Sequence, residues 1–221
     1  MCAFQIAIDG PAGAGKSTIA KKIAEKLSFI YIDTGAMYRA LTYEVLDRKI
    51  AIDNIEEIIH IAKNCNIAFK NKDVFVNNNK VNDDIRSRRV NENVSYIAKI
   101  PEVRNILVDR QKKIASNNNI VMDGRDIGTK VLPNANLKIF LTASVEERAL
   151  RRYNEIKCNN SNVDIESIRS EIVKRDAMDE SREHSPLKKA INAVTIDTTG
   201  LTIKEVVENI LILVRKQCIN I

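Results

Sequence analysis

The sequence is poor in aromatic residues and contains no long hydrophobic run. It has no tryptophan, five tyrosines and five phenylalanines among 221 residues. No stretch of about 18 apolar residues occurs, so we expect no membrane-spanning helix. The N-terminus leads directly into a strand pattern, without the basic region and apolar core of a signal peptide. These absences predict a cytoplasmic protein that does not insert into a membrane.

Closely spaced cysteine pairs are also missing. The four cysteines are far apart in the chain, at Cys2, Cys65, Cys158 and Cys218. Zinc sites and disulfide frameworks have paired spacings, so we expect free thiols in a reducing compartment. The two histidines, His60 and His184, have no partner motif, and we interpret both as surface residues.

The overall composition is that of an ordinary soluble globular protein, with 44% hydrophobic and 29% charged residues. A chain of 221 residues is long enough for one sizeable core, or for a core with a small insertion. The net charge of +6 agrees with an anionic ligand. Charge alone does not separate a nucleotide from a nucleic acid.

One stretch near the N-terminus matches the phosphate-binding loop pattern of Gly, four residues, then Gly-Lys-Ser/Thr. A strand pattern precedes it at Phe4, Ile6 and Ile8, and apolar residues at helical spacing follow from Ile19 to Leu27. In this geometry, backbone N–H groups and a helix N-terminus face the phosphate. The predicted ATP-binding residues are Gly10, Pro11, Ala12, Gly13, Ala14, Gly15, Lys16, Ser17 and Thr18.

Two side chains of this loop carry specific expectations. We expect the Lys16 ammonium group to reach the β- and γ-phosphates of ATP. We expect the Ser17 hydroxyl to bind Mg²⁺.

The rest of the chain alternates strand and helix patterns, which predicts an α/β fold with a parallel sheet covered on both faces. The further strand patterns lie at 29–32, 120–122, 137–141 and 193–196. Residues 66–86 differ, because short β-like runs there are separated by asparagine-rich turns. That segment predicts a small antiparallel insertion.

Polar residues before several apolar patterns predict where helices begin. Asp53 is the expected N-cap of one short helix, and Asp164 that of a helix with Ile165, Ile168, Ile172 and Val173 as its apolar stripe. Capping boxes are expected at Ser144 with Glu147 and at Thr202 with Glu205.

Two polar clusters follow predicted strands, at the sheet edge where ligands bind in such folds. Residues 33–39 read Asp-Thr-Gly-Ala-Met-Tyr-Arg, and residues 123–129 read Asp-Gly-Arg-Asp-Ile-Gly-Thr. An arginine in that position can bind a phosphate through two hydrogen bonds. The alternative for each cluster is a loop with structural caps.

A third cluster is helical. Arg175, Asp179 and Arg182 are spaced at i, i+4 and i+7, and they share one face if the helix continues to Arg182. A basic face on the preceding helix is formed by Arg148, Arg151 and Arg152. The alternative is that these are solvated faces whose exposed ion pairs contribute little.

Together, the motifs resemble those of the bacterial-type cytidylate kinases (CMP/dCMP kinases), a family of nucleoside monophosphate (NMP) kinases. The matching segments, which in order and spacing cover nearly the whole chain, are 10–18, 33–39, 123–126 and 175–182. The resemblance implies a single P-loop NTPase domain, residues 1–221, with a five-stranded parallel core sheet. It also implies an NMP-binding region at 34–116, enlarged by the insertion at 66–86, and a lid at 151–185.

The same resemblance implies a function and roles for residues. The expected activity is phosphorylation of CMP and dCMP by ATP with Mg²⁺, in a monomer that binds neither nucleic acid nor membrane. The expected catalytic residues are Lys16, Arg125 and Arg175. The residues that match CMP-contacting positions are Thr34, Arg39, Ser95, Arg104, Arg125, Asp126, Arg175, Asp179 and Arg182.

The chemistry of the residues agrees with a phosphate acceptor. No convincing catalytic base lies near the motifs, and a hydroxyl acceptor would normally need a carboxylate to take its proton. A phosphate monoester has a second pKa of about 6 and is already mostly dianionic at neutral pH. Catalysis then consists of holding two polyanions in line, which lysine, arginine and Mg²⁺ can do.

Three other functions stay open at this stage. The first is a P-loop kinase that acts on another nucleotide or on a sugar acid. The second is a GTP-binding switch, although the Asn-Lys-x-Asp guanine motif is missing from the sequence. The third is a nucleic-acid-binding ATPase, although few aromatic residues are present to stack on bases.

Overall fold

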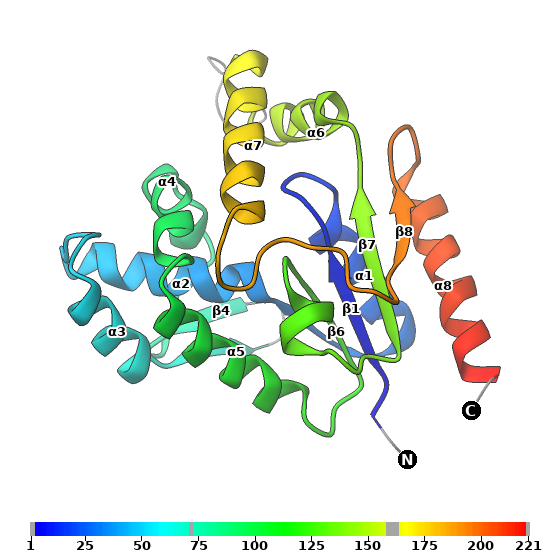
Figure 1. The fold of residues 1–221 in the computed structure, drawn as a ribbon, viewed down its shortest axis with the longest axis horizontal. Helices are drawn as coiled ribbons and strands as arrows, with labels where there is room; N and C mark the ends of the chain where they lie inside the picture. The colour runs from blue at the N-terminus through cyan, green and yellow to red at the C-terminus, as the bar shows by residue number, and fades with distance from the viewer. Residues whose placement is uncertain (1–2, 71–72, 158–163, 220–221) are drawn as a thin grey trace. The chain divides into compact units, whose positions relative to one another are not determined.

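The computed structural model describes residues 3–70, 73–157 and 164–219. The chain forms two compact units, one of residues 1–31 and 115–221 and the other of residues 32–114. Figure 1 shows both as mixtures of helices and strands. Among the described residues, none of the helices has the length and apolar character needed to cross a bilayer.

The first unit contains most of a five-stranded sheet. Its strand order is β2-β6-β1-β7-β8, and β1 pairs in parallel with both β6 and β7, as β7 does with β8. The α/β fold with a parallel five-stranded sheet is therefore confirmed. The strands are β1 (Gln5–Asp9), β2 (Ile30–Asp33), β6 (Ile120–Gly124), β7 (Leu137–Thr142) and β8 (Val194–Asp197).

Helices of the first unit cover this sheet and extend beyond it. They are α1 (Lys16–Leu27), α6 (Val145–Lys157), α7 (Ile165–Glu180) and α8 (Ile203–Ile219), with a π-helical turn η2 (Ile127–Val131) after β6. Helices α1 and α8 contact each other and pack on the sheet (Figure 1). Ile6, Ile8 and Ile23 are fully buried in the resulting core, as their spacing predicts.

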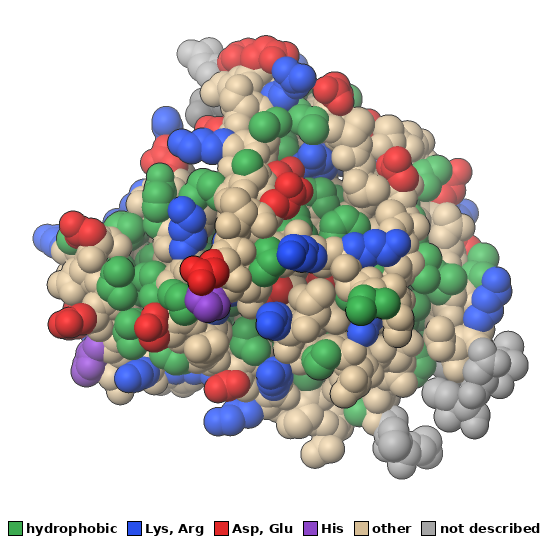
Figure 2. All heavy atoms as spheres, viewed as in Figure 1, with side chains coloured by type: hydrophobic (Ala, Val, Ile, Leu, Met, Phe, Trp, Pro, Cys, Tyr) green, Lys and Arg blue, Asp and Glu red, His purple; other side chains and the backbone are tan. Residues whose placement is uncertain are grey.

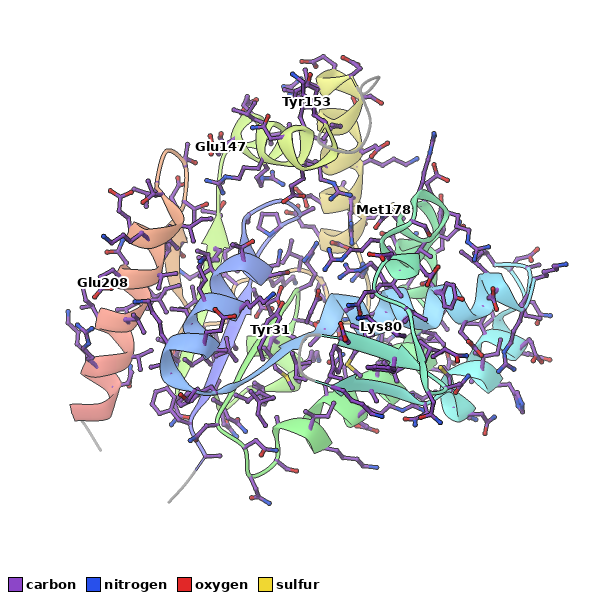
Figure 3. The ribbon with its side chains drawn as sticks, turned by 180° about the vertical axis from the view of Figure 1, so that it is seen from behind. Tyr31, Lys80, Glu147, Tyr153, Met178 and Glu208 are labelled. Atoms are coloured by element: carbon purple, nitrogen blue, oxygen red, sulfur yellow. The ribbon has the colours of Figure 1, made fainter. Side chains whose placement is uncertain are left out.

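Helices α6 and α7 pack against each other through a small apolar cluster of their own. Ala149 of α6 is buried against Ile168 and Ile172 of α7, and Tyr153 of α6 packs beside them (Figure 3). The predicted stripe on α7 is wrong for Ile165 and Val173, which are exposed. We refer to these two helices as the α6–α7 pair.

The second unit is built from helices and the predicted antiparallel insertion. Its elements are α2 (Thr34–Asp47), α3 (Ile55–Asn64), β3 (Ile67–Lys70), β4 (Asp73–Val76), β5 (Asn79–Lys80), η1 (Asp84–Arg86), α4 (Arg88–Ile97) and α5 (Pro101–Ala115). Strands β3, β4 and β5 form an antiparallel sheet. Asn77 and Asn78, both with positive φ, make the two-residue turn between β4 and β5.

The predicted helix starts are mostly right, with two corrections. Asn54, not Asp53, caps α3, because its side chain accepts a hydrogen bond from the Glu57 N–H. The box at Ser144 is half formed, since the Glu147 carboxylate accepts from Arg151 instead. The Asp164 cap and the box at Thr202 and Glu205 are confirmed.

The predictions for thiols and histidines are met where the structure describes them. Cys65 is a buried free thiol, and burial raises its pKa to about 11. His60 and His184 are exposed. Cys2 and Cys158 lie outside the described residues, as does the side chain of Cys218. Figure 2 shows charged side chains of both signs interspersed on the surface it views.

Candidate active site

The predicted phosphate loop connects β1 to α1, and two of its glycines are required by packing. A Cβ atom on Gly10 would lie 2.0 Å from the Leu141 carbonyl oxygen of β7, and the φ of Gly10 is +150°. A Cβ atom on Gly13 would lie 3.0 Å from the Cβ of Arg148. Lys16 is the first residue of α1, so the N-terminus of this helix opens onto the loop. Strand, loop and helix N-terminus form the anion-binding geometry of a P-loop.

Lys16 lies buried in this loop, with only 6% of its surface exposed. Its Nζ atom donates to the carbonyl of Pro11 at 2.6 Å. Burial, assisted by the nearby charge of Arg125, lowers the pKa of Lys16 to about 7. The negative charge of Asp123 acts in the opposite direction. Keeping Lys16 protonated in this buried position therefore costs free energy, because burial disfavours the charged form.

Ser17 faces a carboxylate from the neighbouring strand. Its hydroxyl donates to Oδ2 of Asp123 at 2.8 Å, and the Tyr31 hydroxyl donates to Oδ1 of the same group at 2.8 Å (Tyr31 is labelled in Figure 3). Hydroxyl and carboxylate oxygens are ligands that suit Mg²⁺. Asp123 belongs to the predicted 123–129 cluster, but the sequence alone gave it no role.

The donor set fits a metal that is only partly held by protein. Among the described residues, His, Cys, Asp and Glu side chains form no group of three or more that could hold a metal ion by themselves. Mg²⁺ is commonly bound by one or two protein oxygens together with substrate phosphates and water. Ser17 and Asp123 fit that mode of binding.

Asp9, the last residue of β1, ties the loop region to the segment after β6. Its carboxylate accepts from the N–H groups of Ile127 at 2.8 Å and Gly128 at 2.7 Å. Burial raises the pKa of Asp9 to about 6, although these two hydrogen bonds favour the ionised form. The only sequence signal for Asp9 is a carboxylate at the end of a strand, directly before Gly10.

Three predicted arginines of the first unit act on the carboxylate of a fourth predicted residue, Asp179. Nε of Arg125 donates to Oδ2 of Asp179 at 2.8 Å, and Arg182 donates to Oδ1. Burial by itself would raise the pKa of Asp179, but the charges of Arg125 and Arg182 outweigh it and hold the pKa below its usual range. Arg175 acts in the same direction. Helix α7 ends at Glu180, so Arg182 lies beyond the helix.

The basic face predicted on α6 is only partly solvated. Arg148 is buried, and it forms an ion pair with Asp176 of α7. Arg151 donates to the hydroxyl and carbonyl of Thr198, at 2.9 and 2.7 Å. Arg152 alone fits the solvated interpretation, paired with Glu155 on the surface.

Asp126 is buried at the start of η2, with 4% of its surface exposed. Its carbonyl accepts from the Lys130 N–H at 2.8 Å. Its negative charge is one of the influences that raise the pKa of Asp9.

In the second unit, two of the predicted CMP-contacting residues lie at the start of α2. Thr34 is the first residue of the helix and is buried. Asp33 caps the helix by accepting from the Ala36 N–H at 2.8 Å, and its other oxygen accepts from Arg39 at 2.9 Å. The cap therefore also orients the guanidinium group of Arg39.

The remaining two predicted residues of this unit come from other helices. Ser95 of α4 and Arg104 of α5 are both buried. The Arg104 guanidinium lies 5.2 Å from the centre of the Tyr38 ring and donates to the Ala98 carbonyl at 3.0 Å. A guanidinium over an aromatic ring is favourable and fixes its orientation.

Comparison with known proteins adds independent evidence. Residues 6–216 match the sequence profile of the cytidylate kinase family. The chain is 59% identical over 211 residues to the cytidylate kinase of Alkaliphilus oremlandii, covering 96% of this chain and 97% of the relative. It is 54% identical over 207 residues to that of Alkaliphilus metalliredigens, covering 94% of each chain.

A solved structure supports the fold alone. An uncharacterized protein from Eubacterium ventriosum superimposes with a TM-score of 0.54 at 13% identity, covering 96% of this chain and 98% of the other. The phosphate loop, the sheet order and the full-length sequence match lead to one assignment. This chain belongs to the cytidylate kinase family.

Proposed function

We propose that this protein transfers the γ-phosphoryl group of ATP to CMP and dCMP. The observation that carries the proposal is family membership over residues 6–216. The buried Lys16 in a phosphate loop supports ATP as the donor. An oxygen of the acceptor phosphate forms a bond to the γ-phosphorus, and the bond between that phosphorus and the β–γ bridging oxygen breaks. The products are ADP and CDP or dCDP, with no proton removed from a hydroxyl.

In this proposal, positive charge performs most of the catalysis. Lys16 contacts the β- and γ-phosphates, and Arg125 and Arg175 stabilise the charge that spreads over the transferred group. Backbone N–H groups of the loop within residues 13–18 hold the donor phosphates. Ser17 and Asp123 would hold Mg²⁺, which supplies charge neutralisation when bound.

Candidate residues for recognising the acceptor occur in each unit considered by itself. Cytosine presents an amino donor at N4 and acceptors at N3 and O2. Asp126 accepts from the amino group and Arg104 donates to the acceptors, and Ser95 and Arg182 are further proposed residues for base recognition. The other proposed CMP-binding residues are Thr34, Arg39, Arg125, Arg175 and Asp179.

The first prediction concerns acceptor choice. Uracil has an acceptor at O4 and a proton at N3, so it would leave buried groups unpaired at about 1–3 kcal/mol for each neutral group. We expect CMP and dCMP to be phosphorylated well and UMP, AMP and GMP poorly, with discrimination against UMP of roughly 10⁴. A coupled ADP-release assay at fixed ATP and Mg²⁺ measures kcat/KM for each acceptor.

Asp126→Ala should lose most activity toward CMP and keep its ATP affinity. Equal kcat/KM for CMP and UMP would show that this assignment of the base-binding residues is wrong.

The second prediction concerns Mg²⁺. Ser17→Ala removes one proposed oxygen ligand and should raise the Mg²⁺ concentration needed for half-maximal rate. Thr18→Ala on the same helix is the control, since Thr18 has no proposed metal role. A Mg²⁺ dependence that is unchanged in Ser17→Ala would remove Ser17 from the metal site.

The third prediction follows from the depressed pKa of Lys16. The pKa falls from 10.5 to about 7 on folding, so between these values the unfolded chain binds one proton more than the folded protein. The contribution of Lys16 to the free energy of unfolding therefore rises with pH across this window. Lys16→Met should be more stable than wild type at pH 6, with the advantage shrinking toward pH 10, while kcat falls by about 10² to 10³. Thermal unfolding at both pH values tests this, and a pH-independent difference would contradict it.

The fourth prediction concerns residues 151–185, which we propose as a lid; residues 158–163 of this range lie outside the described residues. Closure would exclude water that otherwise accepts the phosphoryl group. A bisubstrate analogue should slow amide hydrogen exchange in this segment, while β7 serves as an internal reference. If the analogue does not change the rate of amide hydrogen exchange in residues 151–185, the result would argue against a lid.

A further inference from the structure

Two side chains that the proposed reaction does not use hold the backbone of the phosphate loop. The Ala12 N–H donates to Oδ1 of Asp176 at 3.0 Å. The Ala12 carbonyl accepts from Nη1 of Arg148, also at 3.0 Å. Asp176 lies on α7 and Arg148 on α6. The α6–α7 pair therefore fixes both polar backbone groups of one loop residue.

These two side chains are themselves buried and joined to each other. Arg148 is 6% exposed and Asp176 is 8% exposed. Arg148 donates to the second carboxylate oxygen of Asp176 and, through Nε, to the Ala143 carbonyl at 3.1 Å. A buried ion pair is by itself weak evidence for a stabilising role, because desolvation can cancel the attraction. What distinguishes this one is that both partners also hydrogen-bond the same loop residue.

The neighbouring loop residues are restrained as well. The side chain of Arg148 packs so closely on Gly13 that a Cβ there would approach to 3.0 Å. Lys16 donates to the Pro11 carbonyl at 2.6 Å. Three consecutive loop residues are therefore restrained by contacts within the first unit. The Ala12 N–H points at a carboxylate, so it is satisfied before any phosphate arrives.

We infer that Arg148 and Asp176 are positioning residues that hold the phosphate loop in its nucleotide-binding conformation. The affinity for ATP then depends on the position of α7 relative to the phosphate loop. The inference rests on the proposed function only in taking ATP as the ligand. If the loop without this ion pair adopts the binding conformation for a fraction of the time, the dissociation constant rises by the inverse of that fraction.

A purely stabilising role can be separated from a positioning role by replacing the pair instead of breaking it. Either single change, Arg148→Met or Asp176→Leu, leaves one buried charge without its partner. The double variant replaces both charges with apolar side chains of similar volume, which is often neutral or stabilising for buried ion pairs. It should therefore unfold at a higher temperature than either single variant, yet leave Ala12 unrestrained.

The experiment measures dissociation constants by titration calorimetry for ATP with Mg²⁺ and for inorganic triphosphate, a probe of the loop alone. We expect the double variant to raise both constants by about tenfold, corresponding to a loop that is competent one-tenth of the time. Arg148→Lys, which keeps the charge, should have a smaller effect. The KM for CMP should change less than the KM for ATP.

The matched control is Arg169→Met. Arg169 of α7 pairs with Glu146 of α6 at 3.5 Å, so the change breaks an exposed ion pair between the same two helices. It should leave both dissociation constants unchanged. A folded double variant with wild-type affinities, or an equal loss in Arg169→Met, would overturn the inference.

Two further outcomes are also decisive. If the double variant does not fold, Arg148→Met carries the test, and wild-type affinity in that folded variant would refute positioning by Arg148. If the wild type fails to phosphorylate CMP, the proposed function is wrong. The triphosphate affinities of the same variants still decide whether Arg148 and Asp176 position the loop.

Discussion

Burying several positive charges around one short loop is the constraint on which the first unit depends. Lys16 is held where burial lowers its pKa to about 7, beside the charge of Arg125. Three carboxylates from two elements compensate: Asp123 near the end of β6, and Asp176 and Asp179 on α7. Because α7 supplies two of the three carboxylates, the position of this helix affects the electrostatic balance of the loop. Helix α7 therefore supports the proposed phosphate site together with the loop.

This balance suits a protein whose proposed ligands are polyanions. The Asp179 carboxylate pairs with both Arg125 and Arg182 and offsets part of their positive charge. A nucleotide phosphate presents the same kind of charge-assisted acceptor to a guanidinium group. When a nucleotide binds, its phosphate oxygens would replace carboxylate oxygens as hydrogen-bond acceptors for these guanidinium groups. The arginines would therefore have an anionic partner both before and after binding. The charges stay oriented, and the reorganisation needed in the reaction stays small.

Sequence patterns predicted what depends on local spacing. The strands of the sheet, the antiparallel insertion and most helix caps follow from periodicity and from residues within four positions of each other. Contacts between distant residues were out of reach: the Ala12–Asp176 hydrogen bond spans 164 positions. A helical wheel places Arg148 with Arg151 and Arg152, but it does not reveal what each side chain packs against. For the same reason, Asp123 was recognised only as part of a polar cluster after a strand, and Asp9 was not singled out.

The packing of Gly10 bears on how relatives of this chain should be judged. A side chain at this position would collide with the β7 backbone whether or not a nucleotide is ever bound. Selection for folding alone would therefore preserve the first glycine of the loop in a descendant that had become a pseudoenzyme. Lys16 is different, because burying its charge lowers the stability of the folded protein. Once catalysis is no longer selected, drift should remove that lysine first, so its retention is the more informative sign of an active relative.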